Sequence, residues 1–133
     1  MAIVEGNGYP IALHMESASP GEATLVETTV EAKIIEKLPP KLIGDKAYDS
    51  DKLDSRLKEK YGIELIAPNR KKRCKTQDGR SLRRYKRRWK VERFFSWLQS
   101  YRHIVTRYDV YAENYFAMIQ LACSMMFLNL ILR

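Results

Sequence analysis

Cysteine and histidine are scarce in this 133-residue sequence, which contains two of each. Cys74 and Cys123 form no CxxC motif, and the two histidines are remote from them along the chain. We therefore expect neither a disulfide framework nor a zinc site, and a reducing compartment fits this usage. No secretory signal peptide opens the sequence, and its glycine and proline contents are too low to suggest disorder.

Long hydrophobic runs are also absent, apart from one near the end of the chain. Residues 115–132 form an apolar stretch of eighteen residues, which is marginal for crossing a bilayer. Gln120, Ser124 and Asn129 interrupt it at helical positions. We therefore expect residues 112–132 to form a buried C-terminal helix, with no membrane partner.

Acidic residues are nearly missing from one segment. Between Arg70 and Arg93 the sequence has thirteen Lys or Arg and two acids, Asp78 and Glu92, a formal charge of +11. Because the whole chain carries +8, the other 109 residues carry −3. Such a local patch favours an anionic polymer as partner, with interleaved aromatics adding contacts. An RNA-binding or ribosome-associated basic domain is one interpretation that this composition allows.

The first half of the chain predicts an α/β arrangement within a single domain, 1–133. Residues 1–4 and 11–15 flank an Asn-Gly turn and predict a β-hairpin. Ser19 and Pro20 are typical of a helix start, and the apolar spacing continues to Ile34. A strand at 41–44, a helix ended by Gly62 and a strand at 63–67 then predict a parallel β-α-β unit.

Asp45 follows the strand at 41–44, where a side chain can face a cleft. It could instead cap a turn or the next helix. Asp49 or Ser50 can already cap that helix, so we interpret Asp45 as having no structural role.

The second half contains a basic loop at 69–80 and a basic helix at 81–101 that carries Glu92. At 100° per residue, Tyr85, Arg88, Glu92 and Gln99 share one face of this helix. Val91, Phe94, Leu98 and Tyr101 occupy the opposite, core-facing side, and a third stripe contains Lys86, Lys90, Arg93 and Trp97. A lone Glu among cations on a helix surface is usually a partner in weak ion pairs, so that interpretation stands beside a chemical one.

Two motifs resemble those of bacterial insertion-sequence DDE transposases. Tyr85, Arg88 and Glu92 match the spacing of that family's Tyr-Arg-Glu-Lys signature, with Gln99 where Lys is expected. Residues 44–50, Gly-Asp-Lys-Ala-Tyr-Asp-Ser, look like the segment that bears the family's second catalytic Asp. Arg102 and the run 107–109 are also similar to the family's sequence after the Glu, so the resemblance covers nearly the whole chain.

The resemblance implies DNA transposition by cleavage and joining of phosphodiesters, with Asp45 and Glu92 as catalytic residues and ligands of Mg²⁺ or Mn²⁺. It also implies a bacterial cytoplasmic protein that is associated with the nucleoid. Its expected partner is double-stranded DNA, both the transposon ends and the target, bound by a multimer. The residues expected to contact this DNA are Arg70, Lys71, Lys72, Arg73, Tyr85, Lys86, Arg88, Lys90, Arg93, Trp97 and Gln99.

The implied fold is an incomplete RNase H-like fold: a β-hairpin, a helix, a parallel β-α-β unit, the Glu-bearing helix and a C-terminal apolar helix. The family's first, central strand, with its catalytic Asp, is absent from this sequence. Either the hairpin closes directly on the Asp45 strand, or an upstream polypeptide fills the gap. We expect a transposase fragment that is inactive without its upstream segment; the alternative is a non-catalytic DNA-binding remnant or an inhibitor of the full-length transposase.

Overall fold

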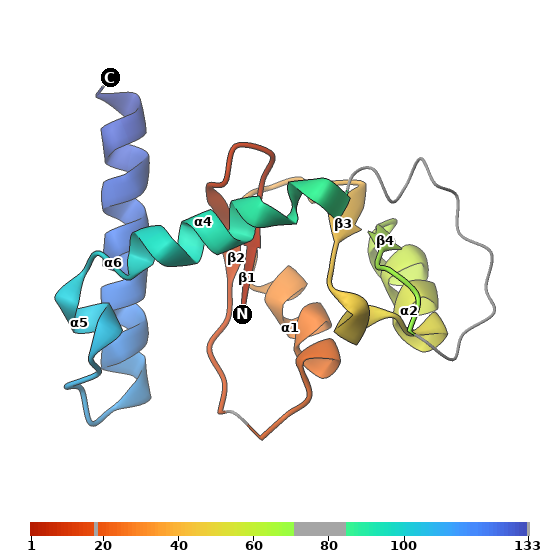
Figure 1. Cartoon of the computed structure of the whole chain (residues 1–133), viewed down its shortest axis with the longest axis horizontal. Coiled ribbons are helices and arrows are strands. Elements are labelled where there is room, and N and C mark those ends of the chain that lie inside the picture. Colours follow the sequence, from red (N-terminus) through yellow and green to blue (C-terminus); the bar gives the residue numbers. More distant parts are fainter. Residues whose placement is uncertain (18, 71–84, 133) are drawn as a thin grey trace.

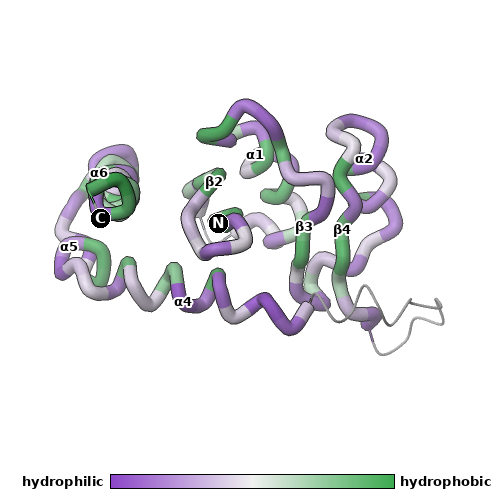
Figure 2. Tube along the Cα trace, turned by 90° about the horizontal axis from the view of Figure 1, so that it is seen from above, coloured by the Kyte–Doolittle hydropathy of each residue, from purple (hydrophilic) through white to green (hydrophobic). Residues whose placement is uncertain are grey.

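Two small sheets and the helices around them form the chain in a computed structural model, which describes residues 1–17, 19–70 and 85–132. The first sheet contains β1 (Ala2–Val4) and β2 (Pro10–Leu13), and the second contains β3 (Lys41–Ile43) and β4 (Glu64–Ile66). Seen from above, helices α1 and α2 lie on one side of the strands and α4 crosses the other side (Figure 2). The mixed α/β class is confirmed, whereas the RNase H-like assignment stays a prediction.

The N-terminal hairpin forms as predicted. β1 and β2 pair antiparallel, with Ile3 opposite Ala12, and β2 is buried along its whole length. Gly8 in the turn has a φ of +93°, and a Cβ there would lie 2.9 Å from Nη2 of Arg93. Glycine is favoured at this position by its positive φ, whereas the near atoms belong to the flexible end of the Arg93 side chain, which can shift.

The helix after the hairpin begins later and ends earlier than the sequence predicts. A 3₁₀ turn, η1 (Glu22–Thr24), precedes α1 (Leu25–Glu31), and the N-cap of η1 is Gly21 without a side-chain cap bond. The prediction of a Ser19 cap was wrong. At the other end the Ile34 N–H donates to the Ile11 carbonyl at 2.8 Å, so the chain joins the edge of β2 instead of continuing the helix.

The β-α-β unit agrees with the prediction in order, direction and boundaries. β3 and β4 pair parallel, with Leu42 beside Leu65, and α2 (Asp51–Tyr61) connects them through the short turn η2 (Lys46–Tyr48). Gly62 ends α2 in the left-handed region with a φ of +67°. Glycine adopts this left-handed conformation at no steric cost, and the conformation allows backbone N–H groups to bond the last helical carbonyls. The end of α2 could therefore be predicted from the sequence.

The two sheets share one hydrophobic cluster but do not pair with each other. Buried side chains of α1 and α2 pack together with partly buried Ile3 from β1 and Leu42 from β3. Within the described residues, however, β1 pairs only with β2, and β3 only with β4. The expectation that the hairpin pairs directly with the Asp45 strand, β3, was therefore wrong. The alternative expectation, that an upstream polypeptide fills the gap, stays a prediction.

The described residues from 85 onward are mostly helical (Figure 1). A 3₁₀ turn, η3 (Lys86–Arg88), leads into α4 (Trp89–Leu98), followed by α5 (Arg102–Val105) and α6 (Ala112–Ile131). α4 extends from beside β3 to α6, and its buried Phe94 and Leu98 join Leu13 and Cys123 in a second cluster. Within the segment 81–101 that was predicted as a basic helix, η3 and α4 cover residues 86–98, and residues 81–84 lie outside the described part.

The C-terminal helix has the predicted position but not the predicted burial. Ala122 and Cys123 are buried, whereas Leu121, Met125 and Leu128 are each about half exposed. The expectation of a buried helix was therefore wrong for the chain by itself, because α6 contacts the rest of the described protein along one side only. Among the described residues α6 alone has a length and hydropathy that would permit a membrane span, and those two properties are weak grounds for one.

Candidate active site

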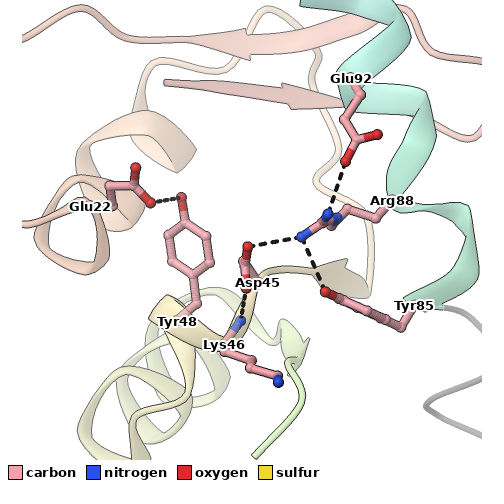
Figure 3. A network of polar contacts seen from close by, with 7 residues as sticks. All are labelled: Glu22, Asp45, Lys46, Tyr48, Tyr85, Arg88 and Glu92. Carbon is pink, nitrogen blue, oxygen red and sulfur yellow. Dashed lines mark hydrogen bonds and ion pairs between the residues drawn. The ribbon is translucent and has the colours of Figure 1, made fainter. Parts of the chain in front are cut away.

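Asp45 lies where β3 ends and the chain turns into η2. Its Oδ1 accepts a hydrogen bond from the backbone N–H of Lys46, which makes it the N-cap of η2. The view that Asp45 has no structural role was therefore wrong. The cap occupies one carboxylate oxygen and directs the other, Oδ2, toward α4 (Figure 3).

Arg88 connects Asp45 with Glu92. Its Nη1 donates to Oδ2 of Asp45 at 2.8 Å, and its Nη2 lies 3.0 Å from Oε1 of Glu92. The same Nη1 donates to the Tyr85 hydroxyl at 3.1 Å, and the guanidinium lies 5.5 Å from the centre of the Tyr85 ring. Asp45 and Glu92, which are 47 positions apart in the sequence, thus meet at one guanidinium, as Figure 3 shows.

The helical phase of α4 and the turn before it explains this meeting. Arg88 and Glu92 are four residues apart, so they form an i,i+4 pair on one helix face. Tyr85 lies one turn earlier and supports the guanidinium from the same face. Helical spacing predicts that these three side chains lie together, and the turn after β3 brings Asp45 to them.

The four polar side chains form a partly exposed, charged group. The exposed fractions are 38% for the Arg88 side chain, 49% for Asp45 and 59% for Glu92. The pKa of Arg88 is raised above its ordinary value, chiefly by the electrostatic influence of Tyr85 and then by the two carboxylates. With two carboxylates and one guanidinium, the group retains an excess of one negative charge.

Tyr48 and Glu22 border this group and were missed in the sequence analysis as site neighbours. The Tyr48 hydroxyl donates to Oε2 of Glu22 at 3.3 Å. Burial, and then the Glu22 carboxylate, raise the pKa of Tyr48 to about 12. The Tyr48 ring covers Gly44, where a Cβ would come within 2.9 Å of it. The tyrosine therefore stabilises the strand end that presents Asp45.

Arg70 has partners inside the protein, although the sequence analysis assigned it to DNA. Its guanidinium donates to the carbonyls of Lys46 and Ala47 at 3.1 and 2.7 Å. Its backbone N–H donates to Oδ2 of Asp49 at 2.8 Å. Arg70 thus links the segment that follows β4 to η2 and to Asp49. The other predicted contacts of this loop, Lys71, Lys72 and Arg73, lie outside the described residues.

The side chains of the third stripe, Lys86, Lys90, Arg93 and Trp97, differ in their contacts and exposure. Arg93 donates to the Asn7 carbonyl in the hairpin turn and lies 5.0 Å from the Trp89 ring centre, and Lys90 lies 5.8 Å from the same ring. Trp97 packs edge-on to Tyr101 and beside the second core cluster. Lys86 and Gln99 are exposed. The stripe therefore contains accessible cations near η3 and a packed aromatic side chain near the C-terminal end of α4.

The donor atoms at this site suit a hard divalent cation in kind but not in number. Asp45 and Glu92 supply carboxylate oxygens, which Mg²⁺ prefers, and both converge on one positively charged group. Over the described ranges, no group of three or more His, Cys, Asp or Glu side chains could hold a metal ion. Two of the carboxylates that such a site needs are present, and further ligands would have to come from elsewhere or from water.

Comparison with known proteins identifies the family of this chain. Residues 1–127 match the family described as transposase DDE domain. The chain is also 27% identical, over 139 aligned residues, to a Burkholderia cepacia protein described as the candidate transposase for insertion sequence element IS402. The match covers 98% of this chain and 63% of the relative, so the chain spans less than two thirds of that protein. No solved structure matches the chain. The family match extends over nearly all of the sequence, including both acids and Arg88, and the chain therefore belongs to the transposase DDE domain family.

Proposed function

We propose that this chain is the C-terminal portion of the catalytic domain of an insertion-sequence transposase, which cleaves and joins phosphodiesters at transposon ends. The observation that carries the proposal is the meeting of Asp45 and Glu92 at one cation, since acids from a strand end and a helix meet there across 47 positions of sequence. Family membership supports the same conclusion. The coarse function, DNA transposition, follows from the family and its relative.

In this proposal Asp45 and Glu92 hold Mg²⁺ or Mn²⁺. When bound, such ions activate an attacking oxygen and stabilise a leaving one in an in-line displacement. The chain's own part is to position the two carboxylates. The Lys46 N–H fixes one oxygen of Asp45, and the helix backbone fixes Glu92. Tyr85 and Arg88 are positioning residues, which orient Glu92 or a DNA phosphate.

The proposed DNA contacts come from the exposed cations of η3 and α4. Lys86 and Lys90 lie one helical turn apart on one stripe, and Arg88 lies on the neighbouring face with Glu92. Contacts of this kind neutralise phosphates and release counterions, so affinity should fall as salt rises. The aromatic side chains Tyr85 and Trp89 lie among these cations and offer flat faces to unpaired bases.

The unpaired edges of β1 and β3 support an upstream transposase segment as the partner. β1 and β3 contribute to one hydrophobic cluster. Within the described residues, however, β1 has a strand partner only on the side of β2, and β3 only on the side of β4. A strand inserted there would pair with both edges and could supply the third acid. The resulting protein would act as a multimer on DNA in the bacterial cytoplasm, in the nucleoid.

The catalytic proposal is tested by nicking of a DNA duplex that carries the element's end sequence. The chain is purified with and without its upstream segment, and product is measured as a function of Mg²⁺. In the complemented protein, Glu92→Gln should lower the nicking rate about 100-fold or more, because loss of a supporting residue around a metal already costs about 10–100-fold. Glu64→Gln, at an exposed position of β4 that pairs with Lys41, is the matched control and should retain activity. Equal rates for Glu92→Gln and Glu64→Gln would remove the catalytic assignment.

The alternative is a non-catalytic DNA-binding remnant that interferes with the full-length transposase through mixed multimers. Its specific support is that the described residues contain only two converging acids, and no set of three. This alternative hypothesis predicts salt-dependent DNA binding but no nicking in any combination with the upstream segment. It also predicts that adding the chain to active full-length transposase lowers the nicking rate.

A further inference from the structure

We propose that Arg88 is an internal cation that occupies the metal position while DNA is absent, and that a DNA phosphate draws it away so that a divalent ion can enter. This inference rests on the proposed function, because it concerns how the Asp45 and Glu92 site is kept closed. It assigns an order of binding, with DNA before metal.

The geometry makes Arg88 and a metal ion mutually exclusive. Two different nitrogens of one guanidinium bind the two carboxylates, at 2.8 Å to Asp45 and 3.0 Å to Glu92. The Lys46 N–H already occupies Oδ1 of Asp45, so Oδ2 is the oxygen that remains for a cation. A divalent ion that bound these two oxygens would compete for them with the guanidinium, which now contacts both. Charge repulsion between the two cations also opposes joint occupancy.

Arg88 can be displaced because its ion pairs are exposed. All three charged side chains are more than one third accessible to water, and ion pairs in such surroundings are weak. A guanidinium also forms two parallel hydrogen bonds with a phosphate, so a DNA backbone offers Arg88 an equivalent partner. The competing ligand for Arg88 is therefore the phosphodiester that the site is proposed to act on.

Tyr85 limits how far Arg88 moves. Its hydroxyl accepts from Nη1 at 3.1 Å, and its ring lies 5.5 Å from the guanidinium carbon. Neither contact uses a carboxylate, so both can persist when Asp45 and Glu92 release the arginine. The released guanidinium thus stays at the edge of the site, where an incoming phosphate would lie.

The test measures Mn²⁺ binding to the whole chain by electron paramagnetic resonance, without any activity readout. Arg88→Ala should bind Mn²⁺ about three- to ten-fold more tightly than the wild type, because the competing cation is gone. Arg88→Lys should lie between them, since an ammonium cannot bridge two carboxylates as a guanidinium does. The matched control is Arg56→Ala, which removes an equal charge from an exposed pair with Glu27 at 3.0 Å and should leave the affinity unchanged.

A second arm adds a short DNA duplex. The duplex should increase the Mn²⁺ affinity of the wild type and leave that of Arg88→Ala unchanged, because no internal cation remains to be displaced. Circular dichroism verifies that each variant is folded, and Arg88→Gln replaces Arg88→Ala if the latter unfolds. An Arg88→Ala affinity equal to or below that of the wild type overturns the inference, as does an equal DNA effect in both proteins.

Two further variants separate this inference from the proposed function. Asp45→Asn and Glu92→Gln, each combined with Arg88→Ala, should lose the gained Mn²⁺ affinity. If both retain it, the ion binds elsewhere and the proposed ligands are wrong. If both double variants bind Mn²⁺ more weakly than Arg88→Ala, although Arg88→Ala itself binds it no more tightly than the wild type, the metal site stands and only the role of Arg88 fails.

Discussion

The two oxygens of Asp45 have different partners, one a backbone N–H and the other a guanidinium. The first contact fixes the side chain in one orientation, and the second uses that orientation to face α4. The role of such a residue is difficult to predict from the sequence, because aspartate serves both as a helix N-cap and as a metal ligand. At Asp45 the structural role and the proposed chemical role belong to the same side chain.

Tyr48 provides a prediction at the same scale. Its pKa is raised to about 12 by burial and by Glu22, above the ordinary value of 10.0 for tyrosine. Because the folded-state pKa is the higher one, the neutral hydroxyl stabilises the fold fully below pH 10 and that stability is lost as the pH rises toward 12. A titration that follows tyrosinate absorbance should therefore show, in Tyr48→Phe, one fewer tyrosine with a pKa near 12 than in the wild type. The free energy of unfolding should also fall less steeply between these pH values in the variant. Identical titration curves for the two proteins would contradict the assignment.

At the scale of elements, α4 carries two functions on different faces. Phe94 is 1% exposed and packs in the core, whereas its neighbour Phe95 is 43% exposed. The 100° step of a helix separates them, just as it brings Arg88 and Glu92 onto one face. The core face anchors the helix, and this anchoring holds Glu92 and Arg88 over the end of β3.

Substitution of the two phenylalanines tests this division. Phe94→Ala should lower the free energy of unfolding by about 3–5 kcal/mol, from lost burial and the cavity that remains. Phe95→Ala, the matched control, should lower it by less than about 1 kcal/mol, because half-exposed side chains bury little area. Urea unfolding followed by circular dichroism measures both. Comparable losses at the two positions would mean that the assigned core face of α4 is wrong.

The helical faces of α4 and the β-α-β unit could be predicted from the sequence because local rules govern them. Periodicity placed Phe94 and Leu98 opposite Glu92, and Gly62 marked the end of α2. The end of α1 and the burial of α6 could not be predicted in the same way. Ile34 continues the helical spacing, but its N–H pairs with Ile11 in β2. α6 is apolar on most sides, and its sequence alone does not say which sides another element covers.

At the scale of the whole molecule, the sheet is divided between two pairs of strands. The Glu64 N–H donates to Pro40, and the Gly44 N–H donates to Ile66. Since backbone groups alternate in direction along a strand, those of Lys41 and Ile43 face away from β4. An unpaired strand edge with accessible N–H groups is a surface that another strand can extend.

Amide hydrogen exchange tests whether this edge is open. In the chain alone the Ile43 amide should exchange much faster than the Gly44 amide, which is bonded within the second sheet. Addition of the upstream transposase segment should slow exchange at Ile43 and leave Gly44 nearly unchanged. Nuclear magnetic resonance resolves the two neighbours. Equal protection of both amides in the chain alone would show that the edge already has a partner.

The sequence by itself determined the order and type of most elements, the faces of α4 and the grouping of Tyr85, Arg88 and Glu92, because these depend on spacing within one segment. Only the tertiary structure decided that Arg88 lies between Asp45 and Glu92, that Asp45 also caps η2, and that the hairpin does not pair with β3. The position of Arg88 and the lack of pairing between the hairpin and β3 depend on how segments far apart in the sequence pack around a shared core, and local propensity carries no information about that packing. The cap is a contact between neighbouring residues, Asp45 and Lys46, which residue type alone does not determine.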